Sequence, residues 1–223
     1  MTMKGITFNL RTLLALTALA ALAAFSLYGY RPANADHEIV GSPSDDRIKV
    51  KAAIETLYFE ESVRQADLIA EVTIAEKLYE VNEPSPKTVY SAAMNQLLKG
   101  KADANLGIRI MQQGNSRYSF NDNPMFQAGD TYLLFLKKAV GMEDDHTYWI
   151  LGEETSIYEQ WDDDRLVKWS LKDSRLAELT PTETNAGLQA AAESVQKKHP
   201  GKEIQVLDRT KFKATIAKEL KRS

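Results

Sequence analysis

The chain has 223 residues, of which 43% are hydrophobic and 26% are charged, a composition typical of folded globular domains and not of disordered chains. It contains no cysteine, which excludes disulfides, thiolate metal sites and a lipid-modified cysteine behind an export signal. Residues 197–223 carry an excess of lysine and arginine, so the net charge of -3 leaves the preceding body acidic. An acidic body argues against nucleic acid as a partner, because binding phosphates requires a concentrated basic surface.

The first 35 residues have the pattern of a cleavable secretion signal. Two basic side chains precede an apolar run from Leu13 to Tyr28, and Ala33 and Ala35 supply the small side chains that a signal peptidase requires. Cleavage there leaves Asp36 as the first residue of a secreted, extracytoplasmic protein. The alternative is an uncleaved membrane anchor, because the apolar run approaches the length that spans a bilayer. An exported chain without cysteine favours a bacterial origin.

The segment after the signal is predicted to be a linker over residues 36–55, because it is rich in the Gly, Ser, Pro and Asp residues of turns. A short helix is expected over Thr56–Ala66. Alternating apolar side chains then predict a strand from Leu68 to about Val81. After a proline-containing turn, Thr88–Leu98 is expected to return as a second strand.

Further strands are expected in the middle of the chain. A third strand is indicated by the alternation from Leu106 to Ile110, and Met125 and Phe126 are predicted to plug the core beneath a loop. Tyr132–Leu136 has no alternation, which is typical of a strand covered on both faces. Short strands are also expected at these positions: Thr147–Leu151, Ile157–Tyr158 and Leu166–Trp169, the last after a turn at Asp162–Arg165.

The final part, residues 171–223, is predicted to be a basic helical tail. An alanine-rich helix is expected over Thr182–His199, where Pro200 and Gly201 stop it. Apolar side chains then recur every four residues at Phe212, Ile216 and Leu220 in a last helix. This tail is expected either to dock on the acidic body or to reach an anionic lipid or wall polymer.

Residues 56–170 therefore form one domain, which is mainly β. Five or six strands of this length, with a short helix before them and helices after them, fit a small closed OB-like barrel. The segments Ala66–Leu78, Thr88–Gly100, Ile108–Gly114 and Phe126–Leu136 resemble exported bacterial proteins of uncharacterised function with such a barrel, similar to the tissue inhibitors of metalloproteinases. The resemblance covers about Thr56–Trp169.

The most specific part of the resemblance has plain structural roles. Gly129 is expected to take a positive φ before a strand, Asp130 to accept backbone hydrogen bonds, and Tyr132–Leu136 to fill the barrel. The motif comprises Phe126, Gly129, Asp130, Tyr132, Leu134 and Phe135. The inhibitors chelate a protease metal through a cysteine at the mature amino terminus, whereas this chain is expected to have Asp36 there. The resemblance therefore supports a similar fold and gives little support to protease inhibition.

Aromatic residues concentrate after the central strand and form the candidate ligand face. Exposed aromatic side chains on a barrel commonly stack on sugars or peptides. The candidates are Tyr148, Tyr158, Trp161 and Trp169. The alternative is ordinary core packing, and strand alternation places Tyr148 and Trp149 on opposite faces.

No metal or cofactor site is predicted. Glu143–His146 and Asp162–Asp164 offer carboxylates of the kind that calcium takes, but neither run has the alternating spacing of a calcium loop, and solvated turns are expected. His37, His146 and His199 include no pair at the spacing of a zinc-binding helix. The sequence also lacks a nucleophile elbow and a phosphate-binding glycine loop.

The sequence therefore predicts an exported, non-enzymatic binding or interaction module. Its partner is expected to be a protein or a cell-envelope polymer, and a membrane only through the uncleaved signal or the basic tail. One alternative is an inhibitor of an extracellular protease. Another is an enzyme acting on envelope material, which requires Asp130, Glu153 and Asp162–Asp164 to converge in one cleft.

Overall fold

The computed structural model describes residues 46–222, except 104–106, 143, 171 and 182–185. The described residues belong to one compact unit, Ser44–Ser223. The predicted signal and its cleavage site at Ala33, Ala35 and Asp36 lie outside the described residues. Within those residues, no helix is long and apolar enough to cross a membrane.

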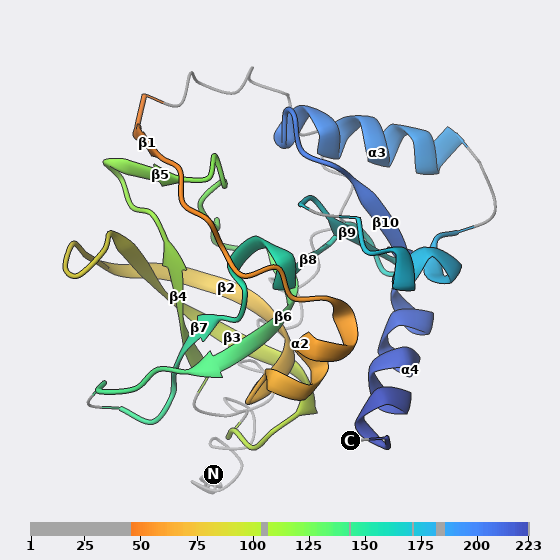
Figure 1. The fold of residues 1–223 in the computed structure, drawn as a ribbon, viewed down its shortest axis with the longest axis horizontal. Coiled ribbons are helices and arrows are strands. Elements are labelled where there is room, and N and C mark those ends of the chain that lie inside the picture. Colours follow the sequence, from red (N-terminus) through yellow and green to blue (C-terminus); the bar gives the residue numbers. More distant parts are fainter. Residues whose placement is uncertain (1–45, 104–106, 143, 171, 182–185, 223) are drawn as a thin grey trace, which may run out of the picture. The chain divides into compact units, whose positions relative to one another are not determined.

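Five strands close into a small barrel (Figure 1). They are β2 (Leu68–Val81), β3 (Lys87–Lys99), β4 (Ile108–Gln113), β6 (Thr131–Lys138) and β7 (Thr147–Ile150). Around the barrel, β2 pairs with β3, β3 with β4, β4 with β7 in parallel, β7 with β6, and β6 with β2. This neighbour order is that of an OB barrel, so the predicted fold class is confirmed.

The barrel interior is filled by the alternating apolar side chains that the sequence pattern indicated. On β2, Leu68, Ala70, Val72 and Ile74 all point inward and are buried. Register shifts between β2 and β3 mark bulges that bend this long hairpin around the barrel. Phe126 is buried as the predicted plug, with its ring centroid 4.5 Å from that of Tyr132 and 5.6 Å from that of Tyr90.

The barrel shares β6 with a second sheet region. The first half of β6 pairs with β8 (Ile157–Gln160), which continues through β9 (Arg165–Lys168) to β10 (Gln205–Asp208). Tyr132, Leu134 and Leu136 therefore face the barrel interior, while Leu133 and Phe135 face a second apolar cluster. The prediction that β6 is covered on both faces is confirmed.

The second apolar cluster joins three helical segments to the outside of the barrel. These are α2 (Phe59–Gln65), the short 3-10 helix η2 (Ser174–Leu179) and α4 (Arg209–Leu220). Phe212 and Ile216 of α4 are fully buried, and the Phe212 ring lies 5.5 Å from that of Phe59 of α2. The last helix of the basic tail therefore docks on the body, with its apolar stripe against α2 and β6 (Figure 1).

A buried ion cluster fixes α4 to the barrel. Glu71 of β2 accepts hydrogen bonds from Arg209 Nε at 2.7 Å and Arg209 Nη2 at 2.9 Å, and from Lys213 Nζ at 3.1 Å. The Glu71 side chain is only 3% exposed. Burial by itself raises the pKa of Glu71, but the hydrogen bonds and charges of Arg209 and Lys213 outweigh burial and hold it below its ordinary value.

Two parts of the structure differ from the sequence-based expectation. The tail is not wholly helical, because Gln205–Asp208 forms β10 between α3 (Ala186–Lys198) and α4. The predicted linker contains β1 (Ile48–Val50), which pairs in parallel with β5 (Tyr118–Phe120). Such short strands have too few residues to give a periodic pattern, and only their partner strands stabilise them.

The barrel motif needs one correction. Gly129 has the predicted positive φ, +93°, just before β6. Phe135, however, packs outside the barrel, because successive strand residues face opposite sides. Asp130 accepts a backbone hydrogen bond at its carbonyl oxygen, from Ile74 N at 2.9 Å, and its carboxylate accepts one from the Tyr132 hydroxyl, also at 2.9 Å.

Candidate functional site

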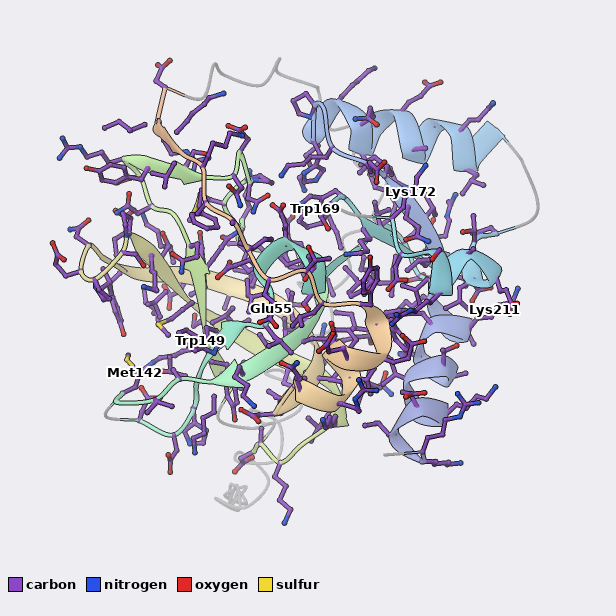
Figure 2. The ribbon with its side chains drawn as sticks, viewed as in Figure 1. Glu55, Met142, Trp149, Trp169, Lys172 and Lys211 are labelled. Atoms are coloured by element: carbon purple, nitrogen blue, oxygen red, sulfur yellow. The ribbon has the colours of Figure 1, made fainter. Side chains whose placement is uncertain are left out.

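The aromatic ligand face expected from the sequence is corrected by the structure. Tyr148 and Trp169 are buried in the barrel cluster and Tyr158 in the second cluster, each no more than 5% exposed. Trp161 is half-buried and packs against a small apolar cluster of Val167, Val195 and Val206 beneath α3. Strand alternation and the closure of two cores on either side of β6 explain why these rings cannot share an exposed surface. Trp149, labelled in Figure 2, is the exposed tryptophan, at 44%.

The acids that the envelope-enzyme alternative requires belong to separate turns with separate partners. Asp130, before β6, contacts Tyr132 and lies 3.7 Å from Lys198 Nζ. Glu153 begins the 3-10 helix η1 (Glu153–Ser156), beside the backbone of Gln113. In the β8–β9 turn, Asp162 pairs with Arg165, and the Asp163 carbonyl accepts a bond from Arg209. This arrangement gives no support to one catalytic cleft.

The described acids of the loop between β6 and β7 are bound to side chains of the loop and of the neighbouring strands. Asp144 pairs with Arg109 of β4 and accepts a hydrogen bond from the Thr147 hydroxyl at 2.8 Å, while Asp145 lies 2.8 Å from Lys138 Nζ. Burial by itself raises the pKa of Asp144. The hydrogen bonds from Thr147 and the His146 backbone and the charge of Arg109 outweigh burial, so the pKa lies below its ordinary value. Among the described residues, no three His, Asp or Glu side chains are arranged to hold a metal ion.

Two neighbouring clefts on the barrel form what we call the His146 groove, because His146 lines both. The first, of about 590 Å³, lies over β2, β3 and β4 and includes Leu78, Ala93 and Arg109. The second, of about 620 Å³, includes Leu97, Lys138 and Tyr148. Strands β3 and β4 and the β6–β7 loop, which together line this groove, correspond to the elements with which OB barrels commonly bind ligands.

The surface of the His146 groove is mixed in character. Leu78 lines the first cleft and Leu97 the second, and each is 38% exposed, so each cleft offers some apolar contact area. The cations Arg109 and Lys138 are matched by acids of the β6–β7 loop, so they hold that loop against the barrel. The groove therefore offers apolar contact area between ordered, paired charges, which suits the binding of an extended ligand.

A second group of polar residues lies buried where α3 meets the barrel. The His199 ring stacks on Trp169, with centroids 4.3 Å apart and planes inclined by 13°, and His199 Nε2 lies 3.5 Å from Glu159 Oε2. Lys198 Nζ donates to Glu159 Oε1 at 2.5 Å. Burial lowers the pKa of His199, and the Glu159 carboxylate offsets this only in part. His199, Glu159 and Trp169 are enclosed, whereas the Lys198 side chain is 36% exposed, and we interpret the group as the anchor of α3.

Glu153 combines a positive backbone φ with a raised carboxyl pKa. Its φ is +49°, directly after Gly152 at +63°. Burial raises the pKa of Glu153 to about 8, with a smaller contribution from Glu154. Strained backbone and a raised carboxyl pKa are typical of functional sites, but also of buried structural acids. Sequence reasoning selected Glu153 only as one acid of a dispersed set.

A comparison of the chain with protein-family models finds no matching family, and a comparison with curated proteins finds no matching sequence. The resemblance to exported barrels similar to the metalloproteinase inhibitors therefore stays a prediction. It depends on the segments quoted above and on the barrel topology. The function must be argued from the geometry of this chain.

Proposed function

We propose that the protein is an exported, non-enzymatic binding module that holds an extended ligand in the His146 groove. The single observation that carries this proposal is the groove itself, which runs over three barrel strands and continues along the β6–β7 loop. Its exposed leucines favour contact with an apolar or amphipathic surface. Arg109 and Lys138 are already paired with Asp144 and Asp145, so ligand binding need not strip water from those ions.

The extracytoplasmic location is part of the proposal and is supported by the signal pattern of residues 1–35. A producing bacterium would be fractionated, and the intact mass of the protein measured in the medium and in the membranes. We expect a soluble species that begins at Asp36. A full-length species confined to the membranes would contradict secretion and favour a tethered domain.

Binding is tested with a variant that fills the groove. Ala93 is exposed and lines the first cleft, so Ala93→Arg places a long side chain across it with little effect on the core. Ala217→Arg, on the exposed side of α4, is the matched control. The probes are purified peptidoglycan fragments and a panel of secreted proteases, with calorimetry for binding and peptide hydrolysis for inhibition.

We expect the wild type and Ala217→Arg to bind the same probe, and Ala93→Arg to bind it about tenfold more weakly or not at all. A probe bound equally by all three proteins would place the binding surface elsewhere. Loss of protease activity on mixing with the wild type would favour the inhibitor alternative. Turnover of peptidoglycan fragments would contradict a non-enzymatic role.

A further inference from the structure

Helix α4 docks through one side and leaves the opposite side open to solvent. Phe212 and Ile216 are fully buried against the body. Arg209 and Lys213 lie toward the same side and reach the buried carboxylate of Glu71. An α-helix turns by about 100° per residue, so these four side chains of α4 occupy no more than half of its circumference. The other half faces the surroundings of the protein.

The outward side of α4 is basic. Lys211 and Lys218 are seven residues apart, and Arg222 follows four residues later. Lys221, the C-cap, keeps the right-handed helical conformation, so the helical period places these side chains close to one line of about 16 Å. We call these four exposed cations the α4 basic face: Lys211, Lys218, Lys221 and Arg222.

The α4 basic face is only weakly neutralised by acids of the protein. Lys218 and Lys221 form no ion pair among the described residues. The other two cations lie 3.8 Å and 3.4 Å from Asp208 and Glu219, and their side chains are 58% and 63% exposed. Exposed pairs of this kind are weak, so the face keeps a positive potential on a protein whose net charge is -3.

The stability of the helix does not account for the whole face. Cations in the last turn of a helix stabilise its dipole, but a cation in the first turn is unfavourable there. Lys211 is the third residue of α4. Arg209 is also in the first turn, where it pairs with the buried Glu71, whereas Lys211 has only the exposed Asp208 at 3.8 Å. An external anion accounts for the position of Lys211.

The shape of the surface indicates the kind of anion. The His146 groove and two further clefts of the described residues are lined by other elements, so none of them adjoins the basic face. Ala214 and Thr215 lie between the cations, and the large apolar side chains of α4 face the body. The contact is therefore open and ionic, without a side chain that inserts into lipid tails.

A lipid surface suits such a contact. Each lysine or arginine close to an anionic membrane strengthens binding about fivefold, without a preformed pocket. The signal pattern of residues 1–35 predicts that the chain crosses a membrane, so a lipid surface is the first anionic surface that the exported domain meets.

We propose that the α4 basic face binds the surface of a membrane that contains anionic phospholipid, with its four cations against the lipid phosphates. The apolar stripe of α4 stays docked on the body, so the helix adsorbs without inserting. The lining of the His146 groove contains no residue of α4, so a failure of this proposal and a failure of the proposed function are distinguishable.

The probes are vesicles of phosphatidylcholine, alone or mixed with phosphatidylglycerol, that carry an acceptor dye on a lipid. The chain has no cysteine, so Ala214→Cys, among the cations, carries a single donor dye. Ala190→Cys on the exposed side of α3 is the control label, and Figure 1 shows α3 and the end of α4 far apart. The full chain is used, so any contribution of residues 13–28 is common to both labels.

We expect energy transfer from the dye at position 214 to rise when the vesicles contain phosphatidylglycerol, and to fall again between about 0.05 M and about 0.5 M salt. The dye at position 190 should respond much less. No rise at position 214, or an equal rise at both positions, would overturn the proposal. Binding to soluble polyphosphate without binding to the anionic vesicles would also overturn it, in favour of an anionic polymer.

Two double variants locate the interaction. Lys218→Gln with Lys221→Gln removes two cations of the basic face and keeps residues that favour a helix. Lys172→Gln with Lys197→Gln makes the same change of net charge at exposed positions outside the face. We expect the first pair to weaken binding to anionic vesicles about 25-fold, and the second to leave it within about threefold of the wild type. Equal losses would show that only net charge matters and would refute the site.

Discussion

The buried Glu71 cluster allows a quantitative test of how the basic tail is held. In Glu71→Gln the carboxylate charge is lost, while Arg209 and Lys213 remain charged against the barrel. Removing one partner of a fully buried ion pair costs about 3–5 kcal/mol, because the remaining charge stays unpaired. Arg209 and Lys213 are 22% and 23% exposed, so water partly solvates them after the change.

We therefore expect Glu71→Gln to lower the free energy of unfolding by about 2–3 kcal/mol, which is at or below the lower end of that range. This corresponds to a fall in melting temperature of about 5–10 °C for a domain of this size. The assay is urea unfolding, followed by the fluorescence of the buried Trp169. The wild type and the variant would be compared at neutral pH.

The control is Glu60→Gln, which removes the partner of Arg175 in an exposed pair with side chains 33% and 47% exposed. Exposed pairs contribute little, so we expect a change of about 0.5 kcal/mol or less. If Glu71→Gln destabilises the protein no more than Glu60→Gln does, the reasoning that a buried charge cluster fixes α4 is refuted.

Three further predictions concern stability. Burial raises the pKa of Glu153 to about 8, above its value of 4.5 in the unfolded chain, so the free energy of unfolding of the wild type should fall as pH rises between these two values. Glu153→Gln should remove this pH dependence in urea titrations, and an unchanged pH dependence would contradict the prediction. Burial lowers the pKa of His199 below 6.5, so the free energy of unfolding should decrease on acidification from about pH 7.5 to about pH 5.5, and should decrease less in His199→Gln. If the two proteins lose stability in parallel over this pH range, His199 does not contribute. Gly129→Ala should cost about 1–2 kcal/mol through its φ of +93° alone, because a Cβ there meets no atom within 4 Å; a neutral calorimetric result would show that this backbone angle is not required.

Local pattern was sufficient for much of the barrel. The alternation from Leu68 to Ile74 predicted the start of a strand that runs to about Val81, and the structure gives β2 as Leu68–Val81. The uninterrupted apolar run at Tyr132–Leu136 predicted a strand covered on both faces. These patterns are informative because successive strand residues face opposite sides of the sheet, so the order of apolar and polar residues shows which face is buried. The apolar stripe at Phe212 and Ile216 predicted an amphipathic last helix, and the structure shows that this stripe docks on the body.

The candidate site was decided by tertiary structure. The sequence placed aromatic residues close together in the chain, but which of them reach the surface depends on how two cores share β6. Trp169 became the stacking partner of His199, a residue thirty positions away in the chain, and no local pattern indicates such a contact. The His146 groove likewise combines residues from distant elements.

The sequence by itself determined a cysteine-free, mainly β domain, its long strands, its plug at Phe126 and its amphipathic last helix, because periodicity and turn chemistry are local properties. Only the tertiary structure decided that Gln205–Asp208 is a strand, that Glu71 pairs with Arg209, and where open surface remains. Those features depend on which elements meet in space, and contacts between residues far apart in the chain leave no periodic signal in the sequence.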